Sequence, residues 1–181
     1  YDESGGSLEI GDAEKDGAVP TPTMIIEKNP KVAELLAVVE EAGTQPVIIW
    51  ISFHWEQIKV CHELHARYGE DQVVTLSALT KDKDGSIQAF KEGRARFLVA
   101  HPRSAAHGLT FVNCALEVFF SLDWSWEAYE QARARIHRAG QTRSCTYIHI
   151  LAADSIDGAI LDVLRRKADA QELLYTVVGR M

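Results

Sequence analysis

Short apolar runs alternate with helix-like segments along this chain, and the alternation restricts the folds that are open to it. Each run is too short for a typical helix but has the length of a buried strand. In chain order the runs read PVIIWIS, QVVTLS, RFLVAH, LEVFFSL and CTYIHIL. Their nearly continuous apolar character is typical of strands that are covered on both faces.

Helix signals separate these runs. The segments predicted to be helical are residues 31–42, 54–68, 86–92 and 126–139, followed by a last helix that Ser155 caps and that runs through Leu164. Apolar residues recur at helical spacing in the first of them, and a glycine closes several. Strand and helix therefore alternate. This indicates right-handed βαβ units and an α/β fold, in which helices flank a mainly parallel sheet on both faces.

The loops at one edge of such a sheet are the first place to look for a site. In open parallel sheets, ligands bind outside the carboxyl ends of the strands. The loops of interest therefore follow Ser52, Ser77, His101, Leu122 and Leu151.

The net charge of −7 is unevenly distributed. Residues 1–20 hold six acidic residues and one lysine, so they account for −5 and leave the other 161 residues nearly neutral. We predict a flexible acidic lead-in over residues 1–22 and one folded domain over residues 23–181, beginning near Met24. A neutral body excludes steering toward DNA by the whole domain but leaves room for a local basic site.

Several classes of protein are disfavoured. No run of about 18 apolar residues and no basic-then-apolar leader is present, and the sequence opens on Tyr1 rather than Met, as a fragment would. The three cysteines form no C-x-x-C pair, so we expect reduced thiols and a cytoplasmic protein. His62 and His65 lack partner cysteines or carboxylates, which favours a solvated helix face over a metal site.

The segment EQARARIHRAGQT, residues 130–142, concentrates arginine in an otherwise acidic chain. If residues 126–139 are helical, Gln131, Arg135 and Arg138 share one stripe at i, i+4 and i+7. Arg133 then lies off the stripe and faces solvent. Two guanidinium groups a turn apart suit a triphosphate, because each offers a planar fork of donors that stays charged. Spacing alone favours the plainer interpretation of a solvated charged face.

The segment HPRSAAHGLTF, residues 101–111, follows the third predicted strand and contains small residues and Gly108. Where side chains are small, the backbone can approach a phosphate or a nucleic-acid strand closely. A single glycine in a loop does not decide between these ligands.

Three stretches together resemble the second RecA-like lobe of Swi/Snf-type ATPases, which belong to the second helicase superfamily. They are FLVAHPRSAAHGLTF, VFFSLDWSWEAYEQARARIHRAGQT and YIHILAADSIDGAIL. The resemblance spans residues 29–174 and implies a RecA-like three-layer fold. Residues 131–141 fit the family's sixth motif, Gln-Ala-x-x-Arg-x-His-Arg-x-Gly-Gln. WSWE replaces the usual Trp-Asn-Pro, which makes the chain more similar to bacterial and phage members than to large chromatin remodellers.

For the nucleotide, the resemblance implies that Arg135 and Arg138 are arginine fingers that reach the γ-phosphate of ATP. Phosphoryl transfer requires positive charge at the equatorial oxygens of that phosphate. Gln131 takes the leading position of the sixth motif and orders the nucleotide side of the cleft. Gly108 is the best-matched residue of the fifth motif, which faces the cleft and a nucleic-acid strand.

For DNA, the resemblance implies contacts to backbone phosphates, which position a protein without reading bases. The residues concerned are Ser52 in the fourth motif, Thr80 after the second predicted strand, and Ser104, His107 and Thr110 in the fifth motif. Asp123 and Trp124 take positions that couple DNA contact to ATP hydrolysis. Two alternatives stay open: Thr80 as a plain turn residue, and Trp124 as a buried side chain beside a capping Asp123.

The chain contains neither a phosphate loop, G-x-x-x-x-G-K-[ST], nor an Asp-Glu-x-His magnesium motif. In the family, both belong to the N-terminal RecA-like lobe, which holds ATP and Mg²⁺. The resemblance implies that this lobe and double-stranded DNA are the partners of the chain in a nucleoid-associated translocase, and that the isolated chain is inactive. Two alternatives are a nucleic-acid-binding module without catalysis and an interaction domain that docks through the acidic lead-in.

Overall fold

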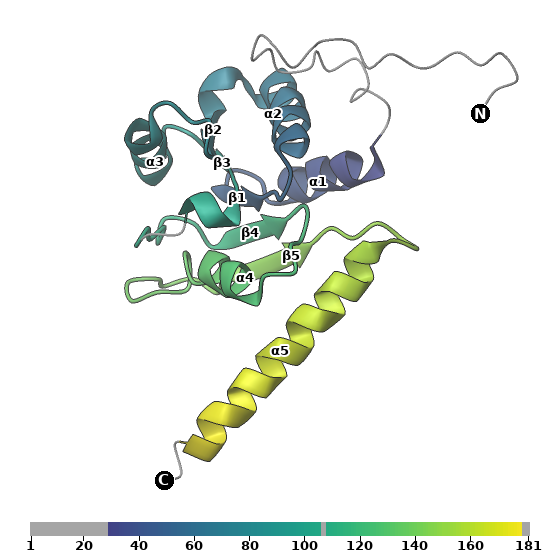
Figure 1. Ribbon diagram of the computed structural model, residues 1–181. Helices are drawn as coiled ribbons and strands as arrows, with labels where there is room; N and C mark the ends of the chain where they lie inside the picture. The colour runs from purple at the N-terminus through teal and green to yellow at the C-terminus, as the bar shows by residue number, and fades with distance from the viewer. Residues whose placement is uncertain (1–28, 106–107, 179–181) are drawn as a thin grey trace, which may run out of the picture.

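The five apolar runs form one sheet in which every strand is parallel to its neighbours (Figure 1). The computed structural model describes residues 29–105 and 108–178. Its strands are β1 Val47–Trp50, β2 Val73–Leu76, β3 Phe97–Ala100, β4 Leu116–Phe119 and β5 Thr146–His149, in the spatial order β2-β3-β1-β4-β5. All five predicted strands are therefore confirmed. The expected lead-in, residues 1–22, lies outside the described residues.

Helices cover both faces of the sheet, which confirms the three-layer α/β fold. α1 Pro30–Glu41 and α2 His54–Tyr68 pack on one face, whereas α3 Lys83–Lys91, α4 Trp126–Arg133 and α5 Ile156–Val178 pack on the other. Two 3₁₀ turns, η2 Glu70–Gln72 and η3 Pro102–Ala105, follow α2 and β3. In Figure 1, α5 (yellow) starts beside the body and runs away from it toward the carboxyl terminus.

The central strand β1 shows why its run reads as continuously apolar. Val47 and Ile49 pack with the helices of one face, and Ile48 and Trp50 pack with those of the other. All four side chains are fully buried. Burial of a large apolar side chain stabilises a fold by roughly 1.5–3 kcal/mol, so the doubly covered strands hold most of the core.

Capping side chains set the beginnings of α3 and α5. α3 begins at Lys83 rather than at the expected Ser86, because the Asp82 carboxylate accepts from the Gly85 N–H at 2.8 Å. Ser155 precedes α5, as predicted, and its hydroxyl accepts from the backbone N–H of the second helical residue. α5 extends past the expected end at Leu164. No helix among the described residues is long and apolar enough to cross a membrane.

The prediction of one helix over residues 126–139 is wrong, because α4 ends at Arg133. The backbone carbonyl of Arg135 accepts from the N–H of Phe111 at 2.9 Å, so the neighbouring loop takes a group that a longer helix would use internally. Gln131 therefore lies on α4, whereas Arg135 and Arg138 lie in the turn that follows. The three side chains do not form a helical stripe.

Candidate functional site

The predicted site residues fall into two groups. The first group follows the carboxyl ends of four strands: Ser52 after β1, Thr80 after β2, Ser104 after β3, and Asp123 and Trp124 after β4. The second group surrounds the end of α4 and comprises Gln131, Arg135 and Arg138, together with Gly108 and Thr110 on the adjacent loop. His107 lies outside the described residues.

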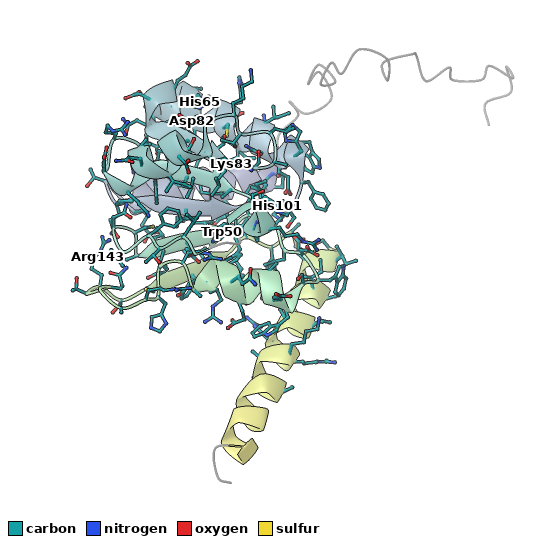
Figure 2. The ribbon with its side chains drawn as sticks, turned by 60° about the vertical axis from the view of Figure 1, so that its left-hand side comes forward. Trp50, His65, Asp82, Lys83, His101 and Arg143 are labelled. Carbon is teal, nitrogen blue, oxygen red and sulfur yellow. The ribbon has the colours of Figure 1, made fainter. Side chains whose placement is uncertain are left out.

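One loop, residues 101–115, joins the two groups. It leaves the carboxyl end of β3 at His101, contacts α4 through η3 and ends at the amino end of β4. Near that end, the Asn113 amide donates to the carbonyl of Phe90 at 2.9 Å, and Arg143 donates to the carbonyl of Asn113. Figure 2 accordingly shows His101 and Arg143 on different sides of the body.

Arg135 is a buried arginine, with 2% of its surface exposed. Its guanidinium donates to the carbonyl of Leu109 at 3.2 Å, and its own carbonyl accepts from Phe111. Burial lowers the pKa of this guanidinium, the charge of Arg138 lowers it further, and Glu117 acts in the opposite direction. Arg135 thus ties the turn after α4 to the loop that carries Gly108 and Thr110.

Arg138 has the opposite environment. Its side chain is exposed, and its Nε donates to the carbonyl of Ala134 at 3.0 Å. The two terminal nitrogens of the guanidinium take no part in that bond. An exposed guanidinium beside a buried one offers two cations at different depths. Arg138 can meet an anion that arrives from outside the chain without any change in the fold.

Two further polar side chains, Gln131 of this group and Arg133 beside it, lie along α4. The Gln131 amide donates to Glu127 at 3.1 Å and is partly exposed. Arg133 pairs with Glu130 at 2.7 Å and lies over the ring of Tyr147, with 4.9 Å between the guanidinium carbon and the ring centre. The expectation that Arg133 faces solvent is therefore only half right, because an aromatic ring covers one side of it.

Glu117 is a buried acid that the sequence reasoning missed. It occupies the middle of β4, between Ile48 of β1 and Tyr147 of β5 in the register of the sheet. Its side chain is 0% exposed, and neither carboxylate oxygen has a hydrogen-bond partner among the described residues. Burial raises the pKa of this carboxyl to about 8. Trp50, whose indole N–H lies near but outside hydrogen-bond geometry, opposes the rise, as do Arg133 and Arg135.

A signal for Glu117 was present in the sequence. It is the single charged residue in the apolar run LEVFFSL. A carboxylate at the centre of a doubly covered strand loses its hydration without compensation. A glutamate in such a run is therefore a signal of a specific role.

Another buried carboxylate, Glu56, organises the carboxyl edge. It accepts from the backbone N–H of Phe53 at 3.1 Å and from the hydroxyl of Ser121, which itself accepts from the N–H of Ser52 at 2.7 Å. Burial raises the pKa of Glu56, and the hydrogen bond from Ser121 is the main opposing influence. This network joins the turn after β1 to the loop after β4. The N–H of Ser52 donates into this network, whereas its buried hydroxyl has no hydrogen-bond partner among the described residues.

A cavity of about 360 Å³ opens at the ends of β1, β2 and β3. Its lining residues are Ile51, His54, Gln57, Ser77, Ala78, Leu79, His101, Arg103 and Ser104. Thr80 borders this region, and its hydroxyl accepts from the Ser77 N–H at 2.9 Å, so it also closes the turn after β2. Trp50 pairs with Ala100 where β1 and β3 end, and His101 follows directly; Figure 2 labels both Trp50 and His101.

The loop after β4 presents Asp123 and Trp124 at this edge. Asp123 forms an ion pair with Arg103 at 3.0 Å, and 66% of the arginine side chain is exposed. Trp124 is 47% exposed, and Ser125 rather than Asp123 caps α4, so the alternative of a buried tryptophan with a capping aspartate is excluded. Arg103 was not among the predicted site residues, although it lies within the motif-bearing stretch at residues 101–111.

Gly108 adopts a left-handed backbone conformation, with φ of 66°. A residue with a side chain would be strained there, so glycine is required by the path of the loop. The position is exposed and an added Cβ would meet no atom within 4 Å, which leaves the backbone open to a ligand.

Across residues 29–105 and 108–178, no group of three or more histidine, cysteine, aspartate or glutamate side chains gathers in a way that could hold a metal ion. Burial raises the thiol pKa of Cys61 and of Cys114 to about 12, so both thiols stay protonated at neutral pH.

Comparison with known families identifies the class of protein that this fold defines. Residues 27–140 match the family model described as the helicase conserved C-terminal domain. The chain belongs to this family.

Its relatives include Swi/Snf-type ATPases, as the sequence motifs indicated. The chain is 29% identical to protein p41 of Acyrthosiphon pisum secondary endosymbiont phage 1, covering 83% of this chain and 32% of that protein. It is 26% identical to the chromatin-remodeling ATPase INO80 of Candida albicans, covering 83% of this chain and 11% of that protein. The chain therefore spans a third or less of the length of these curated relatives.

Solved structures confirm the RecA-like fold. The C-terminal part of the Fun30 ATPase domain superposes with a TM-score of 0.65 at 18% identity, covering 76% of this chain and 46% of that one. The Pyrococcus furiosus Hef helicase domain superposes with a TM-score of 0.59, also at 18% identity, covering 76% of this chain and 28% of that one.

Replacement of Glu117 by Gln should change how the stability of the chain depends on pH. Since the folded pKa of about 8 lies above the ordinary value of 4.5, the unfolded chain loses its proton first as pH rises. Wild-type stability should then fall by up to roughly 1.4 kcal/mol per pH unit between those values. Urea unfolding of the 181-residue chain at pH 5 to 8 should show a fall that is smaller in Glu117→Gln.

The matched control is Glu34→Gln, which changes an exposed glutamate on α1. This variant should keep the wild-type slope. Equal slopes for wild type and Glu117→Gln would contradict the buried, protonated carboxyl.

Proposed function

We propose that the chain is the second RecA-like lobe of a DNA-dependent ATPase and translocase of the Swi/Snf type. It supplies Arg135 and Arg138 to ATP that is held mainly by an N-terminal RecA-like lobe of the same polypeptide. The observation that carries the proposal is the pair of guanidinium groups after α4, within a domain of the helicase C-terminal family. Arg138 is exposed, and buried Arg135 lies three positions earlier.

The fit of this pair to a triphosphate rests on charge and access. When bound between the lobes, Mg²⁺ and ATP supply the phosphoryl group and part of the charge that stabilises its transfer. Arg138 then offers an accessible fork of donors to the γ-phosphate, and Arg135 adds a second cation at the same end of α4. Gln131 lies on the preceding helical turn, and the backbone at Gly108 lines the same side. The chain itself contributes charge and positioning, so we expect it to be inactive alone.

The carboxyl edge is the proposed DNA interface. The loop with Ser104, His107 and Thr110 contacts a backbone strand, and Arg103 beside it adds an exposed cation. The N–H of Ser52 donates to Ser121 and its hydroxyl is buried, while the hydroxyl of Thr80 accepts from the Ser77 N–H within its own turn. We therefore propose that these two residues shape their loops, and that other polar groups of the same loops contact the DNA phosphates. The proposed ligand is double-stranded DNA, which would place the protein on the nucleoid.

Asp123 and Trp124 are proposed to couple DNA contact to ATP hydrolysis. Asp123 pairs with Arg103, and the carbonyl of Trp124 accepts from Lys167 of α5 at 3.2 Å. The segment they form leads directly into α4, whose far end carries the two arginines. A DNA phosphate that binds Arg103 would break its ion pair with Asp123. The change would then reach the start of α4, and Arg138 lies in the turn that follows this helix.

Replacement of Arg138 by Ala should abolish most of the DNA-stimulated ATPase activity of the intact two-lobed protein. An arginine finger contributes roughly 10³–10⁵ in rate, so we expect kcat to fall by about 10³-fold or more. The fold should be unaffected, because Arg138 is exposed. Arg135→Ala should lower kcat as well, with some loss of stability because its buried guanidinium is removed.

The control for charge is Arg94→Ala, which removes another exposed arginine whose ion pair with Glu92 lies at the surface. Its turnover should match the wild type. Near-normal turnover of a well-folded Arg138→Ala protein would defeat the assignment of the arginine finger.

Replacement of Arg103 by Ala should weaken DNA binding uniformly across sequences. Each phosphate contact that a cation makes releases counterions, so the slope of log K against log salt should fall by about one. Binding of a labelled duplex at several salt concentrations measures this slope, with Arg94→Ala again as control. A slope equal to that of the wild type would exclude Arg103 from the DNA interface.

A further inference from the structure

We propose that the cavity at the carboxyl edge, together with the exposed aromatic pair Phe53 and Trp55 beside it, binds an unpaired base of the DNA. The inference rests on the proposed function, because it uses the same DNA edge, and it makes the proposed ligand more specific. The preferred ligand is then a duplex that adjoins an unpaired nucleotide, rather than a duplex that is paired throughout.

The aromatic pair lies on the turn between β1 and α2. Phe53 precedes the first residue of α2, and Trp55 is the second residue of that helix. The side chains are 54% and 46% exposed, and their rings lie nearly parallel, with 17° between the planes and 6.4 Å between the centres. Every base has a flat face, so exposed aromatic side chains stack with bases whatever the DNA sequence. The two adjacent rings thus provide a platform for a base.

Hydrogen bonds beneath the pair hold this turn in place. The Glu56 carboxylate accepts from the backbone N–H of Phe53 at 3.1 Å and from that of Ser52 at 3.3 Å. It also accepts from the hydroxyl of Ser121, in the loop after β4. A base that stacks on the rings therefore does not have to order the backbone below them, and this preorganisation favours binding.

The cavity next to the pair combines a suitable size with apolar walls. His54, which lies between the two aromatic residues in the sequence, lines the cavity, and the volume is about 360 Å³. Small-molecule sites range from roughly 300 to 1,000 Å³, so the cavity suits a single base rather than a longer segment of DNA. Ile51, Ala78 and Leu79 supply apolar lining, and Leu79 is itself exposed. A phosphate gains nothing from such walls, whereas a base can cover them with its faces.

Gln57 supplies the polar group that recognition of a base requires. Its side chain lines the cavity and is only 7% exposed, and its Oε1 accepts no hydrogen bond from any residue that the structure describes. A buried acceptor without a donor is costly, so it favours a ligand that donates to it. The primary amide has an acceptor and two donors, and the edge of an unpaired base carries both kinds of group. The amide can therefore bind that edge while the apolar walls contact the faces.

Arg103 favours a nucleotide over an apolar peptide as the occupant. It lines the same cavity, and its side chain is largely exposed while it pairs with Asp123 at 3.0 Å. The guanidinium offers a fork of donors to the phosphate that is attached to the bound base. An apolar peptide has no group that matches this charge. Apolar walls, a buried amide and an adjacent cation together match the faces, the edge and the phosphate of a nucleotide.

Only an unpaired nucleotide can use the cavity and the aromatic pair together. In an intact duplex the bases are stacked and paired, and a base must leave the helix before a protein can enclose it. This step costs least where the opposite strand is missing. The protein should therefore bind a duplex with a single-stranded gap more tightly than the same duplex without a gap.

The test compares two gapped duplexes in binding to the intact two-lobed protein. Both contain the same short single-stranded stretch, but one has normal bases there and the other has abasic sites, so their phosphates are identical. We expect the normal gap to bind about tenfold more tightly, which is the contribution of one stacked base. A 2-aminopurine in the gap should also lose fluorescence on binding, because stacking on an aromatic ring quenches it.

Variants of the aromatic pair and of the amide identify the residues responsible. Trp55→Ala should remove most of the preference for the normal gap, and Trp55→Phe should restore much of it, because any flat ring can stack. Gln57→Leu should reduce the preference as well, since the amide is lost while the volume is kept. The matched control is Ile156→Ala, which removes an exposed apolar side chain at the start of α5 and should keep the wild-type preference.

The outcomes separate this inference from the proposed function. If Arg138→Ala abolishes DNA-stimulated hydrolysis but the wild type binds the normal and abasic gaps equally, the base site is overturned and the proposed function stands. If Trp55→Ala weakens binding of both gapped duplexes equally, the aromatic pair serves another contact, such as one between the lobes, and the base site is again overturned. If the intact protein binds neither DNA, the proposed function fails and the base site fails with it.

Discussion

Two hydrogen bonds between Arg135 and the loop at Leu109–Phe111 determine the geometry of the site. The carbonyl of Arg135 accepts from Phe111, which ends α4, and its guanidinium donates to Leu109, which holds the loop against the turn. Without this connection, α4 is free to continue, and both arginines lie on an ordinary helix surface. With it, Arg135 is drawn into the core, Arg138 stays outside, and the backbone around Gly108 lies beside them.

The same loop gives the domain a physical route between the two groups of predicted site residues. It begins at the carboxyl edge, where Arg103 pairs with Asp123, and it ends below the turn that carries the arginines. α4 runs along the same face, from the segment after Asp123 to the turn that holds Arg135. A change at the proposed DNA edge therefore has two packed elements through which to reach the proposed nucleotide side.

Much of the fold was predictable, because local patterns determine it. Continuous apolar runs placed all five strands, and the βαβ alternation predicted that they run parallel, but not their order in the sheet. The failures have non-local causes. α4 ends early because the N–H of Phe111, which is distant in sequence, donates to the carbonyl of Arg135. The helical spacing of residues 126–139 does not indicate that partner. α3 starts three residues before the predicted Ser86 because the Asp82 carboxylate caps it, and such a cap is a local feature of the sequence.

For the candidate site, the motif pattern named the segments that carry it but not the environment of each side chain. It could not show that Arg135 is buried while Arg138 is exposed, or that the N–H of Ser52 donates to Glu56 and Ser121. Such details depend on packing between distant elements.

The most direct test of the central claim compares Mg²⁺-dependent ATP hydrolysis by the isolated 181-residue chain and by the intact two-lobed protein, each with DNA. The account predicts turnover by the intact protein and background hydrolysis by the isolated chain. Comparable Mg²⁺-dependent turnover by the isolated chain would contradict it, because a complete nucleotide site would then lie within this lobe.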